Sequence, residues 1–252
     1  MLILERQNEI INILKKKKSV SVDELAKNLF IGQATIRRDL DTLQKQNLIK
    51  RTYGGAVLLE GLNIEIPLYV RENEHTVEKE TIGQKAAELV HDNDILILDS
   101  SSTTYSMIQF LKAKENLTII TNGIKTTMAL GETLHPKVYC TSGRLRENSL
   151  SLVGELAKKC ISNFQVDTLF FSCRGIMKNI GTLDSSDDEA ELRKEMIKIS
   201  RTIVLLCDST KFDKMAFYKV CDFNRINYII TDKQPSEEWS FFFEQCGIKL
   251  IF

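Results

Sequence analysis

The stretch ATIRRDL, Ala34–Leu40, decides how the first part of the chain folds. Ile36, Leu40 and Leu43 recur at i, i+4 and i+7, which is the spacing of one buried face of an α-helix. We therefore expect a helix from about Gln33 to Gln46. Two adjacent arginines flank its apolar face, where a single exposed charge would be enough for solvation. The segments around this helix indicate what the two guanidinium groups bind.

Two further helices are expected before this one. Residues 5–16 carry isoleucine and leucine at helical spacing and lead into a run of lysines. Ser21 and Glu24 form a capping box, in which each side chain accepts a hydrogen bond from the backbone N–H of the other, so a short helix begins here. A break at Phe30–Gly32 separates it from the helix with the arginines. This order is typical of a helix-turn-helix.

A hairpin is expected after the arginine helix. Residues 48–53 and 56–58 are interpreted as short strands around Gly54 and Gly55. Such a hairpin is the wing of a winged helix-turn-helix. We therefore predict a DNA-binding domain over residues 1–59, whose second motif helix enters the major groove with its N-terminus first.

The charge of the chain is divided unevenly along its length. Over all 252 residues, 34 Lys and Arg balance 34 Asp and Glu. Residues 1–58 nevertheless hold eleven basic and six acidic residues, a net of +5, which leaves −5 for the remainder. A basic head favours a polyanion as its partner. We expect that partner to be a double-stranded DNA operator.

The paired arginines can divide the work of DNA recognition. One can bind a phosphate and fix the register, while the other reaches base edges together with neighbouring polar side chains. The sequence does not assign the two roles. The alternative is a salt bridge from either arginine to Asp41 on an ordinary helix surface. The candidate DNA-binding residues are Gln33, Thr35, Arg37, Arg38, Lys50 and Arg51.

Composition and length predict an ordinary globular protein of one large domain or two. No run of about 18 apolar residues and no apolar secretory core occur, so we expect a cytoplasmic protein with no membrane partner. The six cysteines include no C-x-x-C pair and lie in or beside apolar runs, which favours buried free thiols. With only three scattered histidines, no metal site and no cofactor are expected.

Residues 60–75 lose periodicity and are interpreted as a linker. From residue 76 to 252, short apolar segments alternate with helical ones, which indicates an α/β domain with a mostly parallel sheet covered on both faces. The expected strands are Ile95–Leu98, Leu117–Ile120, Val138–Cys140, Val166–Phe171, Ile203–Cys207, Ile226–Ile230 and Ile248–Phe252. The expected helices are Glu78–Val90, Thr104–Leu111, Ile124–Leu130, Glu155–Ser162, Asp188–Ile199 and Ser236–Cys246.

Polar residues follow most of these strands. Hydroxyl, amide and small side chains come directly after six of them, at 99–104, 121–123, 141–144, 172–175, 208–211 and 231–232. In an open α/β sheet the carboxyl ends of the strands share the edge where ligands bind, and helix N-termini there favour anions. Arg144 and Lys211 add positive charge. The set suits a small, hydroxyl-rich, phosphorylated molecule, unless these residues only cap helices and form turns.

These motifs carry a family resemblance. ERQNEIINIL, VSVDELAKNL and ATIRRDLDTLQKQNLIKRTYGGAV resemble the N-terminal domain of the DeoR family of bacterial transcriptional repressors. ILILDSSSTT, TIITNG, SGRLRENSLSLVG, FQVDTLFFSCRGI, DEAELRKEM and LLCDSTKF resemble the effector domain of that family and span nearly all of residues 76–252. The sequence departs from the family pattern at Gly32 and Tyr53, where serine and histidine are usual, and at Ser101 and Ser142, where glycine is usual.

The resemblance implies an effector domain similar in fold to ribose-5-phosphate isomerase and glucosamine-6-phosphate deaminase, with a sugar phosphate as its ligand. It implies a repressor of a carbohydrate-metabolism operon, which the sugar phosphate releases from DNA. A ligand that changes the spacing of two heads on a two-fold operator requires a homo-oligomer, a dimer or tetramer. The effector-binding residues so implied are Asp99, Ser100, Ser102, Thr103, Thr104, Thr121, Asn122, Gly143, Asp167, Glu189, Asp208 and Lys211, together with the strand-end Arg144.

Two alternatives remain open. Asp167 and Glu189 could be the base and acid of an isomerase-like enzyme, although an enzyme has no need of a winged helix-turn-helix. Alternatively, the body only assembles the oligomer and binds no ligand, because Ser101 and Ser142 put side chains where a backbone would approach phosphate. Activity assays test the first alternative, and ligand titration tests the second.

Overall fold

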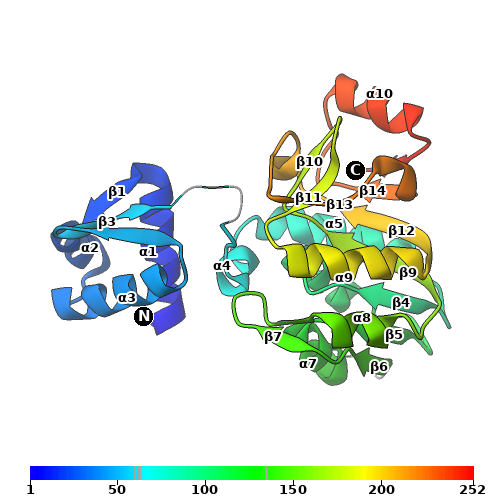
Figure 1. The fold of residues 1–252 in the computed structure, drawn as a ribbon, viewed down its shortest axis with the longest axis horizontal. Helices are drawn as coiled ribbons and strands as arrows, with labels where there is room; N and C mark the ends of the chain where they lie inside the picture. The colour runs from blue at the N-terminus through cyan, green and yellow to red at the C-terminus, as the bar shows by residue number, and fades with distance from the viewer. Residues whose placement is uncertain (60, 62–63, 134–135) are drawn as a thin grey trace. The chain divides into compact units, whose positions relative to one another are not determined.

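The protein is described by a computed structural model that covers residues 1–59, 61, 64–133 and 136–252 (Figure 1). The chain divides into two compact units, Met1–Val70 and Arg71–Phe252, here called the head and the body. Residues 60, 62 and 63 of the expected linker lie outside the described residues. The helix α4 (Leu68–Glu72) is formed inside the segment expected to be a linker.

The head is a three-helix unit with a small antiparallel sheet. Its helices are α1 (Ile3–Lys17), α2 (Val22–Leu29) and α3 (Gln33–Lys45). Its strands β1 (Ser19–Ser21), β2 (Ile49–Thr52) and β3 (Gly55–Leu58) pair in the order β1-β3-β2. The winged helix-turn-helix prediction is confirmed. Strand β1 was not predicted, because three residues give too short an alternation to detect.

The helix ends of the head follow the local sequence. The Ser21 hydroxyl accepts from the Glu24 N–H at 3.1 Å and so caps α2. The Glu24 carboxylate pairs with the Lys17 ammonium, so the structure supports only half of the expected capping box. Gly32 is the N-cap of α3. Ile36, Leu40 and Leu43 of α3 are fully buried in the head core.

The body is built on a seven-stranded sheet in which every strand pair is parallel. The order across the sheet is β15-β14-β12-β9-β4-β5-β6. All seven predicted strands are present, and the prediction of a mostly parallel α/β body is confirmed. Their bounds are β4 (Ile95–Leu98), β5 (Thr118–Thr121), β6 (Lys137–Cys140), β9 (Val166–Ser172), β12 (Ser200–Leu206), β14 (Tyr228–Ile230) and β15 (Lys249–Ile251).

Helices cover both faces of this sheet (Figure 1). Alternate strand residues such as Phe170 and Phe171 belong to two different core clusters, one on each face. Helices α8 (Glu155–Ile161), α9 (Asp187–Lys198) and α10 (Glu237–Gln245) contribute to the Phe171 cluster. Helices α5 (Thr76–Glu88) and α7 (Ile124–Thr133) contribute to the Phe170 cluster. The shorter helices are α6 (Ser102–Tyr105) and the 3-10 turns Ile108–Phe110, Ser209–Lys211 and Phe223–Arg225.

Two small antiparallel sheets were not predicted. One pairs β7 (Arg144–Arg146) with β8 (Ser151–Val153), and the other has the order β10-β11-β13. The latter strands are β10 (Gly175–Met177), β11 (Gly181–Asp184) and β13 (Tyr218–Cys221). These strands are three or four residues long and lack a clear period of two, so only tertiary pairing defines them.

The expectation that the cysteines are buried needs correction. Three of the six free cysteines are buried, but Cys140 is exposed and the other two are intermediate. Within the described residues, no helix has the length and apolar character needed to cross a membrane.

Candidate functional site

The exposed face of α3 carries the two arginines. Arg37 and Arg38 both point away from the head core and are exposed. The Arg37 guanidinium donates to Gln33 Oε1 at 3.1 Å, and Gln33 Nε2 donates to Asp23 Oδ1 at 2.6 Å. The alternative ion pair with Asp41 is not formed, because Asp41 accepts from Arg51 at 2.5 Å. Arg38 has no side-chain partner within the described residues.

The wing adds two further cations to the head. Lys50 on β2 is exposed, and the neighbouring Arg51 is partly buried and held by Asp41. Thr35, in the first turn of α3, is partly exposed. Tyr53, at the turn between β2 and β3, is fully exposed. The predicted DNA-binding residues are therefore at or near the surface of the head, on α3 and β2.

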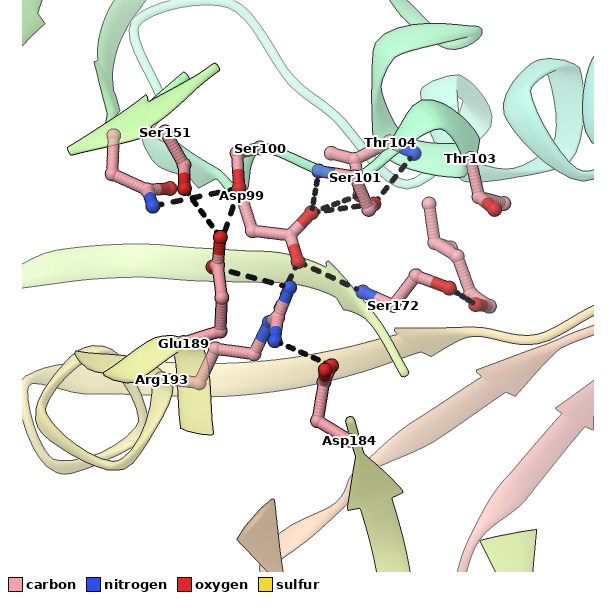
Figure 2. A network of polar contacts seen from close by, with 12 residues as sticks. Asp99, Ser100, Ser101, Thr103, Thr104, Ser151, Ser172, Asp184, Glu189 and Arg193 are labelled. Atoms are coloured by element: carbon pink, nitrogen blue, oxygen red, sulfur yellow. Dashed lines mark hydrogen bonds and ion pairs between the residues drawn. The ribbon is translucent and has the colours of Figure 1, made fainter. Parts of the chain in front are cut away.

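In the body, the loop after β4 is organised around the buried carboxylate of Asp99 (Figure 2). Asp99 Oδ1 accepts from the Ser101 N–H at 3.1 Å, the Ser101 hydroxyl at 2.6 Å and the Thr104 hydroxyl at 2.7 Å. Asp99 Oδ2 accepts from the Ser172 N–H at 3.2 Å. Asp99 is thus occupied by protein donors and fixes the loop shape.

Arg193 on α9 joins three carboxylates around this loop (Figure 2). It donates to Asp99 at 2.9 Å and to Asp184 at 2.7 Å, and it lies 3.6 Å from Glu189. Burial alone would raise the pKa of Asp99 and of Glu189, but the charge of Arg193 and the hydrogen bonds outweigh it. The pKa of both carboxyls is therefore lowered. The carboxylates remain ionised and the loop is locked to α9.

Glu189 connects the loop to the β7–β8 hairpin. One of its oxygens accepts from the Ser151 hydroxyl and lies 3.4 Å from Arg146. The other accepts from the Ser100 hydroxyl at 3.4 Å, and Asn122 Nδ2 approaches the same hydroxyl at 3.5 Å. Loops after two strands, a helix and a hairpin thus meet at the carboxyl edge of the sheet.

Lys211 lies at the same edge of the sheet, in the 3-10 turn that follows β12. Its ammonium donates to the Ser172 hydroxyl at 2.8 Å and the Thr103 hydroxyl at 3.3 Å, and it lies 3.1 Å from Asp208 Oδ2. Burial would raise the pKa of Asp208, but the charge of Lys211 and the Thr210 hydrogen bonds lower it. Asp208 and Lys211 therefore form an ion pair directly beside the loop.

Two polar atoms at this edge are buried without a hydrogen-bond partner in the described structure. They are Asn122 Oδ1, after β5, and Thr141 Oγ1, after β6. Both residues are almost completely buried. A buried polar atom without a partner is costly, so each is suited to meet a polar group of a ligand.

The remaining predicted effector residues lie in three different settings. Thr121 and Ser102 are buried at the ends of their elements, and Thr121 Oγ1 accepts from the Gly123 N–H at 3.1 Å. Gly143 has φ +137°, and a Cβ there would lie 2.5 Å from the Val153 carbonyl, so a side chain is excluded. Arg144 is exposed and paired with Asp188 at 2.5 Å.

Asp167 does not join the site, which corrects its assignment. It is the second residue of β9, so it lies at the amino edge of the sheet, opposite the loops after the strands. Its carboxylate accepts from the Ile95 N–H at 2.9 Å, at the start of β4. Asp167 and Glu189 therefore cannot act as one acid–base pair.

Sequence reasoning also missed members of the network. Arg193, Asp184 and Ser151 were not considered, although Arg193 stands four residues after Glu189 within DEAELRKEM and so shares its helix face. Ser172 was noted only as part of a strand-end loop. Within the described residues, no group of three or more His, Cys, Asp or Glu is arranged to hold a metal ion.

Comparison with known proteins matches both units. Residues 6–61 match the DeoR-like helix-turn-helix domain, and residues 74–233 match the DeoR C terminal sensor domain. The HTH-type transcriptional regulator YulB of Bacillus subtilis is 36% identical over 92% of this chain and 90% of its own. The glycerol-3-phosphate regulon repressor of Escherichia coli K12 is 30% identical over 92% of this chain and 91% of its own.

Among solved structures, ribose 5-phosphate isomerase A of Methanocaldococcus jannaschii is similar to part of this chain. The similarity covers 53% of each chain, with 14% identity and a TM-score of 0.39.

Proposed function

Since the chain belongs to the DeoR family of transcriptional regulators, we propose that it represses a carbohydrate-metabolism operon and that a phosphorylated sugar relieves the repression. The head binds the operator through the first turn of α3, with Gln33, Thr35, Arg37 and Arg38 facing the major groove. Lys50 and Arg51 of the wing bind phosphates next to it. We propose that the protein acts in the cytoplasm, where its DNA operator is.

The carboxyl edge of the body sheet takes the effector. The observation that carries this proposal is the pair of buried, unpartnered oxygens of Asn122 and Thr141 beside the hydroxyl-rich loop 100–104. A sugar hydroxyl can donate to Asn122 Oδ1, and a phosphate can accept from the hydroxyls of the loop. Asp99 and Glu189 hold the loop in shape, while Lys211 and Asp208 line its side.

The name of one relative supports the chemistry of the effector. The glycerol-3-phosphate regulon repressor is named for a small hydroxylated phosphate ester, and it aligns with nearly all of this chain. We propose that a similar class of molecule acts here, and that the effector changes the spacing of two heads in a homo-oligomer, a dimer or tetramer.

The geometry argues against both alternatives, the isomerase-like enzyme and the body that binds no ligand. An isomerase-like enzyme loses its proposed acid–base pair, because Asp167 lies at the other edge of the sheet. A body without a ligand was suggested by Ser101 and Ser142, where the family usually has glycine. Ser101 has an ordinary extended backbone, with φ −75°, and its hydroxyl caps α6 and donates to Asp99. The serine thus supports the loop conformation, which favours a working site.

Thermal unfolding of the full chain against a panel of phosphorylated sugars and their unphosphorylated parents tests the effector proposal. A ligand present at a hundredfold its Kd adds about 2.7 kcal/mol to the free energy of unfolding, which is a visible shift of Tm. A shift with one phosphorylated sugar and not with its parent supports the proposal. The absence of any shift would favour the body that only assembles the oligomer.

A further inference from the structure

The cations described so far at the effector site already have acidic partners. Lys211 lies 3.1 Å from Asp208 and also donates to two hydroxyls, so its three N–H groups are used. Arg144 is paired with Asp188, and Arg193 is shared among three carboxylates. These three side chains therefore supply little uncompensated positive charge to an anionic ligand.

Two other cations beside Lys211 have no such partner. Arg174 stands in the loop between β9 and β10, two residues after Ser172, and Lys214 stands three residues after Lys211. Both side chains are half-buried. Neither makes a hydrogen bond or an ion pair with any of the residues that the structure describes. A partly desolvated charge without a partner is costly to the folded state.

Backbone contacts hold the two segments against each other. A Cβ on Gly175 would lie 2.0 Å from the carbonyl oxygen of Lys214, so the start of β10, directly after Arg174, packs on the backbone of Lys214. One residue further, Ile176 forms a β-bridge with Phe212. Asp213, next to Lys214, accepts from the Trp239 indole at 2.9 Å. The positions of the two cations are thus set by the fold.

The pKa of each of the two side chains is lowered. Burial lowers the pKa of Arg174, and the nearby charge of Arg71 lowers it further. Burial also lowers the pKa of Lys214, followed by repulsion from Arg174 and Lys211. The acids that oppose these effects include Asp184 and Asp208, which are already bound by Arg193 and Lys211. Positive charge is therefore in excess on this side of the sheet edge.

We propose that Arg174 and Lys214 form a second anionic subsite beside the loop 100–104, so that the effector carries two anionic groups. One group is the phosphate of the proposed function, on which this inference rests, and the other is a second phosphate or a carboxylate at the far end of the sugar chain. Two cations that lack a protein partner gain one when this second group binds. A monophosphate of a neutral sugar leaves them uncompensated.

Calorimetric titration of the full-length protein tests the subsite. The probes are pentose and hexose monophosphates, the matching bisphosphates, and phosphorylated aldonic acids of the same chain lengths. At least one compound with two anionic groups is expected to bind tenfold or more tightly than its matching monophosphate. Equal affinities for every matched pair would overturn the inference. The bisphosphate and aldonic acid series show which second anion is preferred.

Variants assign the effect to the two side chains. Arg174→Gln and Lys214→Gln are each expected to bring the affinity ratio between the two-anion compound and its monophosphate close to one, with the monophosphate affinity changed less than twofold. Lys112→Gln, which removes an exposed lysine that has no ion-pair partner among the residues the structure describes, is the matched control and keeps the ratio. A ratio that survives in both variants would also overturn the inference.

The ligand-free variants provide a second readout. Removing either cation relieves repulsion, so Arg174→Gln and Lys214→Gln should unfold at a Tm equal to or above that of the wild type, whereas a structural role would lower it. Binding of monophosphates without any preference for a second anion rejects the subsite alone. If none of the phosphorylated compounds binds, the proposed function fails and the subsite fails with it.

Discussion

Arg6 on α1 and Asp39 on α3 form a two-pronged ion pair inside the head, with Nε 2.5 Å from Oδ2 and Nη2 3.0 Å from Oδ1. Both residues are nearly excluded from solvent. The acidic residue of ATIRRDL therefore belongs to the fold, and it fixes the helix so that the two preceding arginines face outward. One short stretch thus holds both the anchor of the helix and its proposed DNA-binding groups.

Removing either outward arginine is expected to weaken operator binding without unfolding the head. Arg37→Ala and Arg38→Ala should each cost about 1–3 kcal/mol of binding free energy, measured by fluorescence anisotropy on a labelled duplex. The variant that removes a phosphate contact weakens all sequences alike and lowers the salt slope by about one, while the variant that removes a base contact relaxes sequence preference. Lys45→Ala, at the other end of α3, is the control. Wild-type affinity in both arginine variants would contradict the orientation proposed for α3.

Breaking the Arg6–Asp39 pair should destabilise the head strongly. Arg6→Met leaves the Asp39 carboxylate buried without a counter-ion, which typically costs about 3–5 kcal/mol. The double variant Arg6→Met with Asp39→Leu should recover much of this loss, because it removes the isolated charge. Urea unfolding followed by circular dichroism measures both. If the double variant loses as much free energy of unfolding as the single variants Arg6→Met and Asp39→Leu lose together, the pair does not act as a unit.

Arg193 is expected to be the most sensitive residue of the effector site. Arg193→Met leaves Asp99, Asp184 and Glu189 close together without their shared cation, so stability should fall by about 3–5 kcal/mol at neutral pH. Arg193→Lys should recover only part, because an ammonium cannot make the forked contacts of a guanidinium.

The same cluster predicts that the protein loses stability at acidic pH. Because the pKa of Asp99 and of Glu189 is lowered in the folded state, their contribution is present above about pH 4, the range where free carboxyls titrate, and is lost as the pH falls below it. Thermal unfolding of wild type and Arg193→Met between pH 3 and 7 should converge toward the acid end. Curves that stay parallel would contradict this account.

Lys79 predicts a pH dependence on the alkaline side. Its ammonium donates to the carbonyls of Arg71 and Glu74, yet burial, and then the charge of Lys211, lowers its pKa to about 8. The unfolded chain keeps the proton up to about pH 10.4, so the folded state releases it first and stability rises with pH between these values. The Tm of the wild type relative to Lys79→Met should therefore increase from pH 8 to pH 10. Lys112→Met controls for the general loss of one lysine.

The sheet of the body was predictable because each strand contains a short apolar run, and parallel strands bring their carboxyl ends to one edge whatever their order. The same rule should have excluded Asp167, since it precedes the apolar part of β9 instead of following it. The Arg193 network depends on β11 and on the hairpin of β7 and β8, whose short strands have no sequence signature. Its contacts could therefore not be read from the sequence.

Arg174 shows that the sequence does not reveal which cations have carboxylate partners. It stands in one of the strand-end loops, as Arg144 and Lys211 do, and nothing in its neighbours separates it from them. Only the structure shows that Lys211 and Arg144 have carboxylate partners while Arg174 has none among the described residues. The number of partners, which depends on side chains distant in sequence, decides which cation is available to a ligand.

The most direct test of the central claim is operator affinity of the full-length protein with and without a phosphorylated sugar. A duplex selected from a random library serves as the operator, and the sugar is one that raises Tm in the thermal panel. At a saturating concentration the sugar should weaken operator binding by about 1–3 kcal/mol, a five- to 150-fold change in Kd. An operator affinity that does not change, or that rises, at the same saturating concentration would contradict release of the repressor by this ligand.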